Sequence, residues 1–199
     1  MRGALIEVID HGSGNCGPLK ACLKQAGFSV VIRSSLGASR SADALLLPGV
    51  GNFGFGMRTL RSRELDLYIC DWVASGSPLV GICLGMQMLF ETSDEAKGEK
   101  GLSLLDGSSS ALDHGSFHIG WNHTTFIGQP RHSGDYFYNH SFRVNTREEY
   151  VTGTVEFENK ALVASVRRAN VHGFQFHPEK SQDQGVALLR STLQDVLDG

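Results

Sequence analysis

The chain has 199 residues, 41% of them hydrophobic, and a formal net charge of −3. This length supports one domain with a proper core and is too short for two. Lysines and arginines form no dense stripe, and no run of about 18 apolar residues occurs, which argues against partners such as nucleic acid or a membrane. Four cysteines without a disulfide spacing and an N-terminus without a cleavage-site pattern favour a cytoplasmic protein that acts on a small molecule.

In the first half of the chain, strand and helix patterns alternate. Apolar runs predict strands, and apolar residues three and four positions apart predict helices. The predicted strands cover 4–9, 28–32, 44–47 and 79–82, and the predicted helices cover 19–26, 64–74 and 84–90. Right-handed crossovers between such elements give a parallel sheet.

The second half has a different pattern. Residues 92–101 are polar and predict a loop, and from Ser116 onward short alternating segments predict antiparallel strands. The remaining predictions are a hairpin of 151–155 and 161–166, a strand at 171–176 and a helix at 185–197. We therefore expect a single α/β domain over 1–199, with an open, mostly parallel twisted sheet, helices on both faces and added antiparallel strands in the C-terminal half.

Cys83 lies where a buried strand is expected to turn sharply into a helix. Gly81 and Gly85 flank it, in the spacing of the Gly-x-Ser-x-Gly nucleophile elbow. A helix N-terminus favours an anion and therefore a thiolate. A small core residue is the alternative, and we accept it for Cys16, Cys22 and Cys70. For Cys83 we predict a nucleophile, because a merely packed sulfur needs no flanking glycines.

A base and an orienting carboxylate for this thiol are present near the C-terminus. His177 and Glu179 follow the strand predicted at 171–176, with Pro178 between them. A cysteine nucleophile needs a base to move its proton, and the base needs an acceptor to fix its tautomer. The sequence Pro48-Gly-Val-Gly-Asn-Phe-Gly54 follows the third strand, and its backbone is either an oxyanion site or an ordinary flexible turn.

Three segments resemble the signature blocks of the class I (triad) glutamine amidotransferases. They are Pro48-Gly-Val-Gly-Asn52, Gly81-Ile-Cys-Leu-Gly-Met-Gln87 and Phe176-His-Pro-Glu179. Further blocks at 10–15, 120–122, 136–142 and 177–181 make the chain similar to the glutaminase subunits of imidazole glycerol phosphate synthases in histidine biosynthesis. The family implies hydrolysis of L-glutamine through a cysteine thioester, without a cofactor. The ammonia would pass to a separate (β/α)8-barrel cyclase as a heterodimer partner.

The resemblance also implies roles for single residues. Cys83 would be the nucleophile, His177 the general base and acid, and Glu179 the carboxylate that orients it. The other implied roles are main chain at the oxyanion for Val50, Gly51 and Leu84, glutamine binding for Gln87, Ser141 and Phe142, and the partner interface for Asn15, Trp121, Asn122 and Lys180.

Two positions depart from the family pattern. His11 stands where the family usually has tyrosine, and Asn139 stands where an aliphatic residue commonly precedes the His-Ser pair. Neither is in the triad. They leave open a related role, in which the glutaminase serves a sugar amidotransferase of surface-polysaccharide synthesis.

Three rival interpretations remain. Gly12-Ser-Gly-Asn-Cys-Gly17 matches the fingerprint of NAD(P)-binding Rossmann oxidoreductases. The second strand, however, ends at Ile32-Arg33 without the acidic residue that binds a ribose, although an arginine can instead bind a 2′-phosphate. A binding module that retains an inactive pocket is the second. A metal site is the third, but the spacing of His114, His118, His123 and His132 matches no structural zinc pattern.

Overall fold

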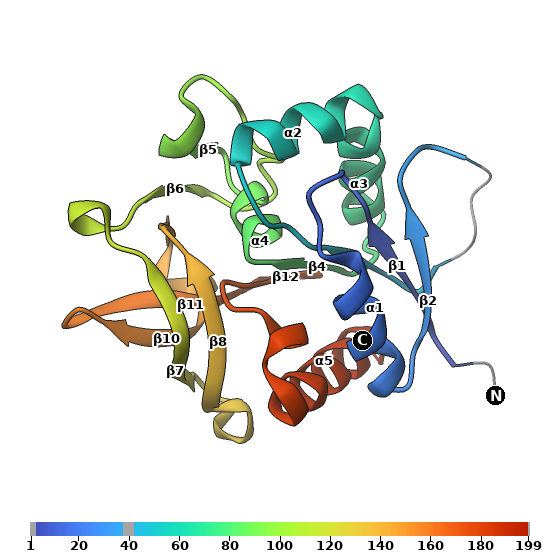
Figure 1. Cartoon of the computed structure of the whole chain (residues 1–199). Coiled ribbons are helices and arrows are strands. Elements are labelled where there is room, and N and C mark those ends of the chain that lie inside the picture. The colour runs from blue at the N-terminus through green and yellow to red at the C-terminus, as the bar shows by residue number, and fades with distance from the viewer. Residues whose placement is uncertain (1–2, 38–41, 199) are drawn as a thin grey trace.

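The computed structural model describes residues 3–37 and 42–198, and its central feature is one mixed sheet. In this part of the chain the sheet has nine strands in the order β2-β1-β3-β4-β12-β11-β10-β7-β8 (Figure 1). The parallel strands are β1 (Leu5–Ile9), β2 (Ser29–Arg33), β3 (Ala44–Leu47), β4 (Leu79–Ile82) and β12 (Val171–Phe174). The antiparallel strands are β7 (His118–Phe126), β8 (Gly134–His140), β10 (Val151–Phe157) and β11 (Lys160–Arg168).

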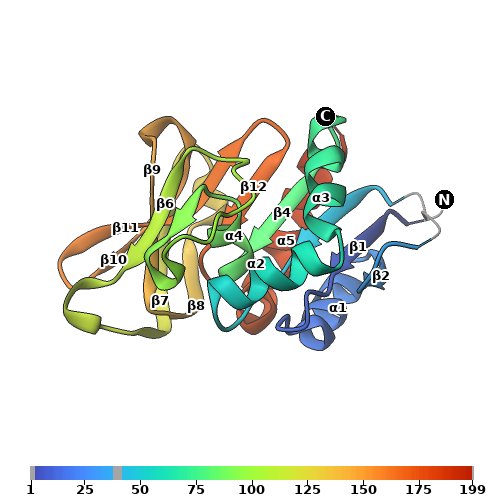
Figure 2. The same cartoon turned by 90° about the horizontal axis from the view of Figure 1, so that it is seen from above.

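Helices cover both faces of the parallel half (Figures 1 and 2). One face carries α1 (Cys16–Gln25) and α5 (Gln182–Leu197), and the other carries α2 (Phe53–Ser62), α3 (Leu65–Ala74) and the short α4 (Leu84–Met88). Successive strand residues point to opposite faces, so each helical layer has its own core. Within the described residues, no helix has the length and apolar character needed to span a membrane.

A smaller sheet lies beside α4 and consists of β5 (Thr92–Ser93), β6 (Gly107–Ala111) and β9 (Phe142–Thr146). The sequence predicts a loop at 92–101, but this segment begins with the short strand β5, which is followed by a single helical turn at Asp94–Ala96. Strand β6 was missed, because its sequence Gly-Ser-Ser-Ser-Ala lacks the apolar alternation that marks a strand. The added strands therefore begin before Ser116.

The alternation of strands and helices predicted for the first half is confirmed, but the helix α2 was not predicted. Glycines at positions 54 and 56 obscured this helix, since glycine disfavours helix interiors. A Cβ on Gly54 would lie 2.9 Å from Cβ of Ala96, and one on Gly56 would lie 2.9 Å from Sδ of Met88. The glycines let α2 pack closely on its neighbours. The side chain of Asn52 caps the helix by accepting the N–H of Phe55 (3.0 Å).

The predicted hairpin is confirmed, with longer strands and a two-residue turn. Glu158 and Asn159 both have positive φ (49° and 59°), as the tight type I′ turn requires. Strand β12 differs from the expectation that an antiparallel strand carries His177. It pairs in parallel with β4 and antiparallel with β11, and therefore joins the two halves of the sheet.

Candidate active site

Cys83 occupies the turn between β4 and α4. Its φ of 54° and ψ of −111° lie outside the regions that non-glycine residues usually adopt, which is typical of a strained functional turn. Its amide donates to the carbonyl of Phe174 on β12 (2.7 Å). The side chain is 5% exposed, so the turn holds the sulfur within the protein rather than on its surface.

The glycines on either side of Cys83 are required by close packing. A Cβ on Gly85 would lie 1.8 Å from the carbonyl oxygen of Leu47, and one on Gly81 would lie 2.9 Å from the carbonyl of Gly85. Distances below 3.0 Å do not occur for real Cβ atoms. The two glycines thus let β3, β4 and α4 meet at the elbow that the sequence predicted.

His177 and Glu179 form a buried pair after β12. Nδ1 of His177 lies 2.8 Å from Oε1 of Glu179, and the two side chains are 1% and 4% exposed. The main chain around them is also fixed, because the amide of His177 donates to Phe137 O and its carbonyl accepts the hydroxyl of Ser181. The carboxylate can only accept, so it favours the form of the imidazole with a proton on Nδ1.

The electrostatics connect this pair to Cys83. Burial lowers the pKa of His177, but the charge of Cys83, together with the charge and hydrogen bond of Glu179, outweighs burial and raises it to about 10. His177 Nε2 and Glu179 Oε2 are buried without a hydrogen-bond partner among the described residues. The parallel pairing of β4 and β12 thus brings Cys83, His177 and Glu179 together at one end of the sheet.

A cavity of about 110 Å³ adjoins the sulfur. Its lining includes every residue that the sequence predicted for the oxyanion and for glutamine, namely Val50, Gly51, Leu84, Gln87, Ser141 and Phe142, together with Cys83. Glu95, Asn139 and His140 also line it, and the sequence gave no role to Glu95 or His140. The walls come from both halves of the sheet and from the 48–51 segment.

Gln175 is a contact of Cys83 that the sequence reasoning missed. Its Nε2 lies 3.9 Å from Sγ of Cys83, and its Oε1 accepts from Nε2 of Gln87 (3.2 Å), which also donates to Phe142 O (3.1 Å). Gln175 is 1% exposed. The sequence signal for it was a polar residue between two phenylalanines in a predicted strand. The thiol also lies 3.9 Å from the carbonyl of Asn139, so the main chain of the unusual residue there contacts Cys83.

The 48–51 segment crosses directly over the start of α4. A Cβ on Gly49 would lie 2.7 Å from Leu84 Cβ and 2.8 Å from Gly85 N, so only glycine allows this approach. The N–H of Val50, however, donates to the carbonyl of Ser13 (2.9 Å). The segment is at the cavity, but this amide is not free to bind an oxyanion there.

Three of the four predicted interface residues lie on or beside elements next to β8 and the turn Pro178–Lys180. Trp121 on β7 is 49% exposed and packs edge-on against Phe137 of β8, with ring centroids 6.1 Å apart. Nζ of Lys180, in the turn Pro178–Lys180, lies 5.5 Å from the centroid of the same Phe137 ring. Asn15 precedes α1, which packs against that turn.

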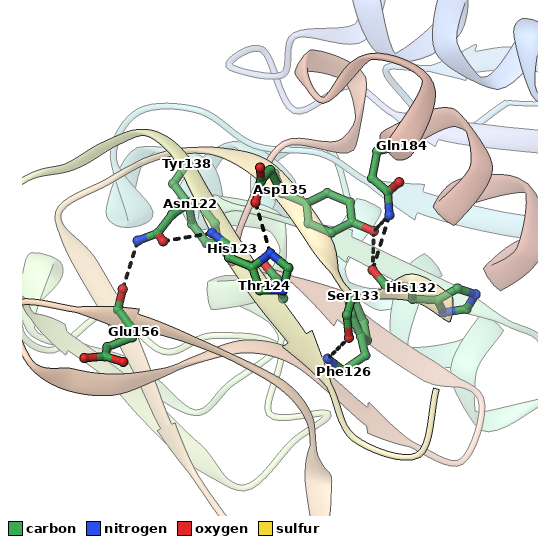
Figure 3. Close-up of polar contacts among 11 residues, drawn as sticks. Asn122, His123, Thr124, Phe126, His132, Ser133, Asp135, Tyr138, Glu156 and Gln184 are labelled. Carbon is green, nitrogen blue, oxygen red and sulfur yellow. Dashed lines mark hydrogen bonds and ion pairs between the residues drawn. The ribbon is translucent and has the colours of Figure 1, made fainter. Parts of the chain in front are cut away.

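Asn122 has internal contacts. Figure 3 shows its amide Nδ2 donating to the carbonyl of Glu156 on β10 (2.9 Å) and its Oδ1 accepting the amide of His123 (2.8 Å). Nδ2 also lies 3.3 Å from Nε2 of His118. Strand alternation directs Asn122 to the face opposite Trp121, where it holds β7 against β10.

Residues on which the dinucleotide-binding and metal-site interpretations depend are bonded to other side chains. Arg33 forms a buried ion pair with Glu7 on β1, and the hydroxyl of Tyr68 donates to the same carboxylate (2.9 Å). Arg33 is therefore not available to a 2′-phosphate. Of the histidines weighed as metal ligands, His118 bonds to His140 (3.0 Å), His123 to Asp135 (3.0 Å) and His132 to Ser191 (3.1 Å).

Comparisons with known proteins show the family to which the chain belongs. Residues 7–196 match the model of the family "Glutamine amidotransferase class-I". The fold is similar to that of a solved glutamine amidotransferase (TM-score 0.80, 19% identity, 98% of this chain and 99% of that one) and to PurLQS from Thermotoga maritima (TM-score 0.79, 18% identity, 98% and 99%). At these identities the likeness concerns the fold alone.

Relatives found by sequence narrow the family further than the fold does. The imidazole glycerol phosphate synthase subunit HisH of Halalkalibacterium halodurans is 38% identical over 94% of both chains, and that of Thermotoga maritima is 39% identical over 95% of this chain and 96% of that one. The Arabidopsis thaliana protein "imidazole glycerol phosphate synthase hisHF, chloroplastic" is 31% identical over 98% of this chain but 35% of its own length. The chain therefore belongs to the class-I glutamine amidotransferase family and, within it, to the HisH subunits of imidazole glycerol phosphate synthase.

Proposed function

We propose that this chain hydrolyses the side-chain amide of L-glutamine at Cys83 and delivers the ammonia to a cyclase subunit that makes imidazole glycerol phosphate. One observation carries the proposal. Cys83 lies in a strained elbow beside the His177–Glu179 pair, and its cavity is lined by the other residues that the family motif assigns to the substrate. Membership in the HisH family supports the choice of substrate and pathway.

The chemistry follows from the triad. His177, whose pKa is raised, takes the proton of the Cys83 thiol, and the sulfur attacks the amide carbon of glutamine. His177 then gives its proton to the departing nitrogen, which leaves as ammonia, and the acyl group remains as a thioester. A water molecule that loses its proton to His177 cleaves the thioester and releases glutamate. Glu179 keeps the imidazole oriented throughout.

The negative charge on the reacting oxygen needs backbone donors, and the 48–51 segment is the candidate to supply one. With the N–H of Val50 bound to Ser13, the site lacks that donor. We therefore propose that the isolated chain is a poor glutaminase and that its partner promotes rotation of the Gly49–Val50 peptide. Such coupling prevents the release of ammonia when no acceptor is present.

The proposed partner is a (β/α)8-barrel cyclase that forms a heterodimer with this chain. The plant relative named hisHF is about three times as long as this chain, and this chain matches only 35% of it. In that protein, the printed name therefore covers a large additional segment besides the part that resembles this chain. The proposed docking face combines Trp121, Lys180 and Asn15. The large apolar side chains of Phe117 and Ile119, 67% and 63% exposed, extend it along β7.

The test is glutamate production by the chain alone and with a cyclase subunit of a HisH relative. We expect partner-dependent turnover that Cys83→Ala abolishes, whereas Cys70→Ala, on α3, retains it. Identifying the natural partner that co-purifies with the chain then distinguishes the histidine pathway from surface-polysaccharide synthesis. Co-purification of a sugar amidotransferase would replace the histidine pathway with the polysaccharide one, and absence of turnover with any partner would leave a binding module.

A further inference from the structure

His11 is a buried side chain outside the triad, at a position where the family usually has tyrosine. It follows β1 and has no exposed surface. Its Nε2 lies 2.8 Å from the carbonyl oxygen of Pro48, and its Nδ1 lies 3.0 Å from the hydroxyl of Ser13. Burial lowers the pKa of His11, so the imidazole is neutral at physiological pH.

These contacts fix the tautomer of His11. A carbonyl oxygen can only accept, so the single proton of the neutral ring is on Nε2 and is donated to Pro48. Nδ1 is then an acceptor, and the hydroxyl of Ser13 donates to it. The result is a directed chain from the Ser13 hydroxyl through the imidazole to the Pro48 carbonyl.

Pro48 opens the segment that passes over Cys83. The next residue, Gly49, lies against Leu84 and Gly85 at the start of α4, where a Cβ would be 2.7–2.8 Å from them. The position of the Pro48 carbonyl therefore determines how the Gly49–Val50 peptide meets the reacting sulfur. The ring of His11 also lies close to α2, since a Cβ added to Gly56 would be 3.6 Å from it.

We propose that His11 is a positioning residue of the glutaminase site, whose imidazole anchors the Pro48 carbonyl so that the Gly49–Val50 peptide can present its amide to the oxyanion. The inference rests on the proposed glutaminase function and adds a residue to it. The anchor acts on the peptide before the one that rotates, so it holds one end of the segment while the Val50 amide changes its partner.

Two variants of nearly equal shape separate the hydrogen bond from the volume of the ring. His11→Gln places an amide Nε2 donor near Pro48, and His11→Met has the same length without a donor. With the cyclase present, we expect His11→Met to lower kcat roughly tenfold, the rate equivalent of one hydrogen bond, with little change in KM for glutamine. His11→Gln should retain kcat within about threefold.

Two probes of Cys83 show whether the oxyanion site is what changes. Glutamate γ-semialdehyde forms a tetrahedral adduct with the thiol and needs the backbone donors, whereas iodoacetamide alkylates the thiol by displacement and does not. His11→Met should weaken binding of the semialdehyde about tenfold and leave the alkylation rate unchanged. Loss of alkylation as well, or a lowered thermal unfolding midpoint with equal kcat, would assign His11 a purely structural role.

Equal activity of His11→Gln and His11→Met, high or low, would overturn the proposal, because it would show that the donor to Pro48 has no role. This result is distinct from failure of the proposed function, in which the unmodified chain and cyclase together would not hydrolyse glutamine.

Discussion

The amide of Cys83 and the carbonyl of Phe174 are joined by a 2.7 Å hydrogen bond between adjacent parallel strands. This bond extends the β4–β12 pairing by one residue beyond Ile82 and Phe174, which lie opposite each other. It sets the thiol of Cys83 beside the segment that leads to His177. The relative position of the proposed nucleophile and the proposed base is therefore determined by sheet register rather than by flexible loops.

Gly85→Ala tests the packing of the elbow. The new Cβ would meet the Leu47 carbonyl at 1.8 Å, and backbone cannot give way as a side chain can. We expect a loss of at least about 3 kcal/mol in the free energy of unfolding, measured by urea titration. Gly17→Ala in α1 has no atom within 4 Å of its Cβ and should be neutral or stabilising by up to about 1 kcal/mol. Similar stability of the two variants would contradict the packing argument.

The His177 titration should depend on Cys83. The folded-state pKa of about 10 is above the value of about 6.5 for an unfolded chain, so the folded state favours the protonated ring. The stability that this adds is complete below about pH 6.5 and is lost as the pH rises through about 10. In Cys83→Ala we expect a lower pKa of His177 by NMR and a smaller loss of stability between pH 6.5 and 10. Cys70→Ala should titrate like the unmodified chain, and an unchanged His177 in Cys83→Ala would disprove the coupling.

Trp121 should dominate the proposed docking face. A large, half-exposed aromatic that packs on Phe137 has the character of an interface hot spot, so Trp121→Ala should weaken cyclase binding about 30-fold, or about 2 kcal/mol. Phe55→Ala on α2 is the matched control, since both aromatics are 49% exposed. Calorimetric titration with the cyclase would measure both. A larger effect at Phe55 would move the interface to the other side of the molecule.

His172 should destabilise the protein in acid. Burial and the charge of Arg167 lower its pKa to about 4, against an opposing effect of Asp195, and its Nε2 has no hydrogen-bond partner among the described residues. The folded state then binds fewer protons than the unfolded chain, so stability falls as the pH falls from about 6.5 towards 4. His172→Leu should gain roughly 1 to 3 kcal/mol over the unmodified chain across this range. Parallel stability curves for the two proteins would refute this.

The elbow could be predicted from the sequence because its causes are local. Gly81 and Gly85 are required by contacts at the turn itself and around it, and their spacing is visible in seven consecutive residues. The His177 segment was also visible as a motif. Its strand direction was not, because the pairing of β12 with β4 joins residues about 90 positions apart. Nothing local distinguishes a parallel from an antiparallel neighbour.

The sequence did not predict α2, β6 or the contact of Gln175, and all three depend on tertiary packing. Phe53, Met57 and Leu60 give α2 a helical spacing, but Gly54 and Gly56 lower its propensity, and only the neighbouring elements explain them. Strand β6 has almost no apolar residue and is held by its pairing with β9. The contact of Gln175 with the sulfur likewise depends on a register that the sequence does not reveal.

The cavity beside Cys83 is enclosed by two structurally different walls. One wall is the elbow, which follows a parallel strand supported by helices on both faces. The other includes Ser141, between β8 and β9, and Phe142, the first residue of β9. The outer strands are not part of the β4–β12 pairing that positions Cys83 and the His177 segment. A scaffold of this kind allows the outer wall of the cavity to change while the geometry around the thiol is kept.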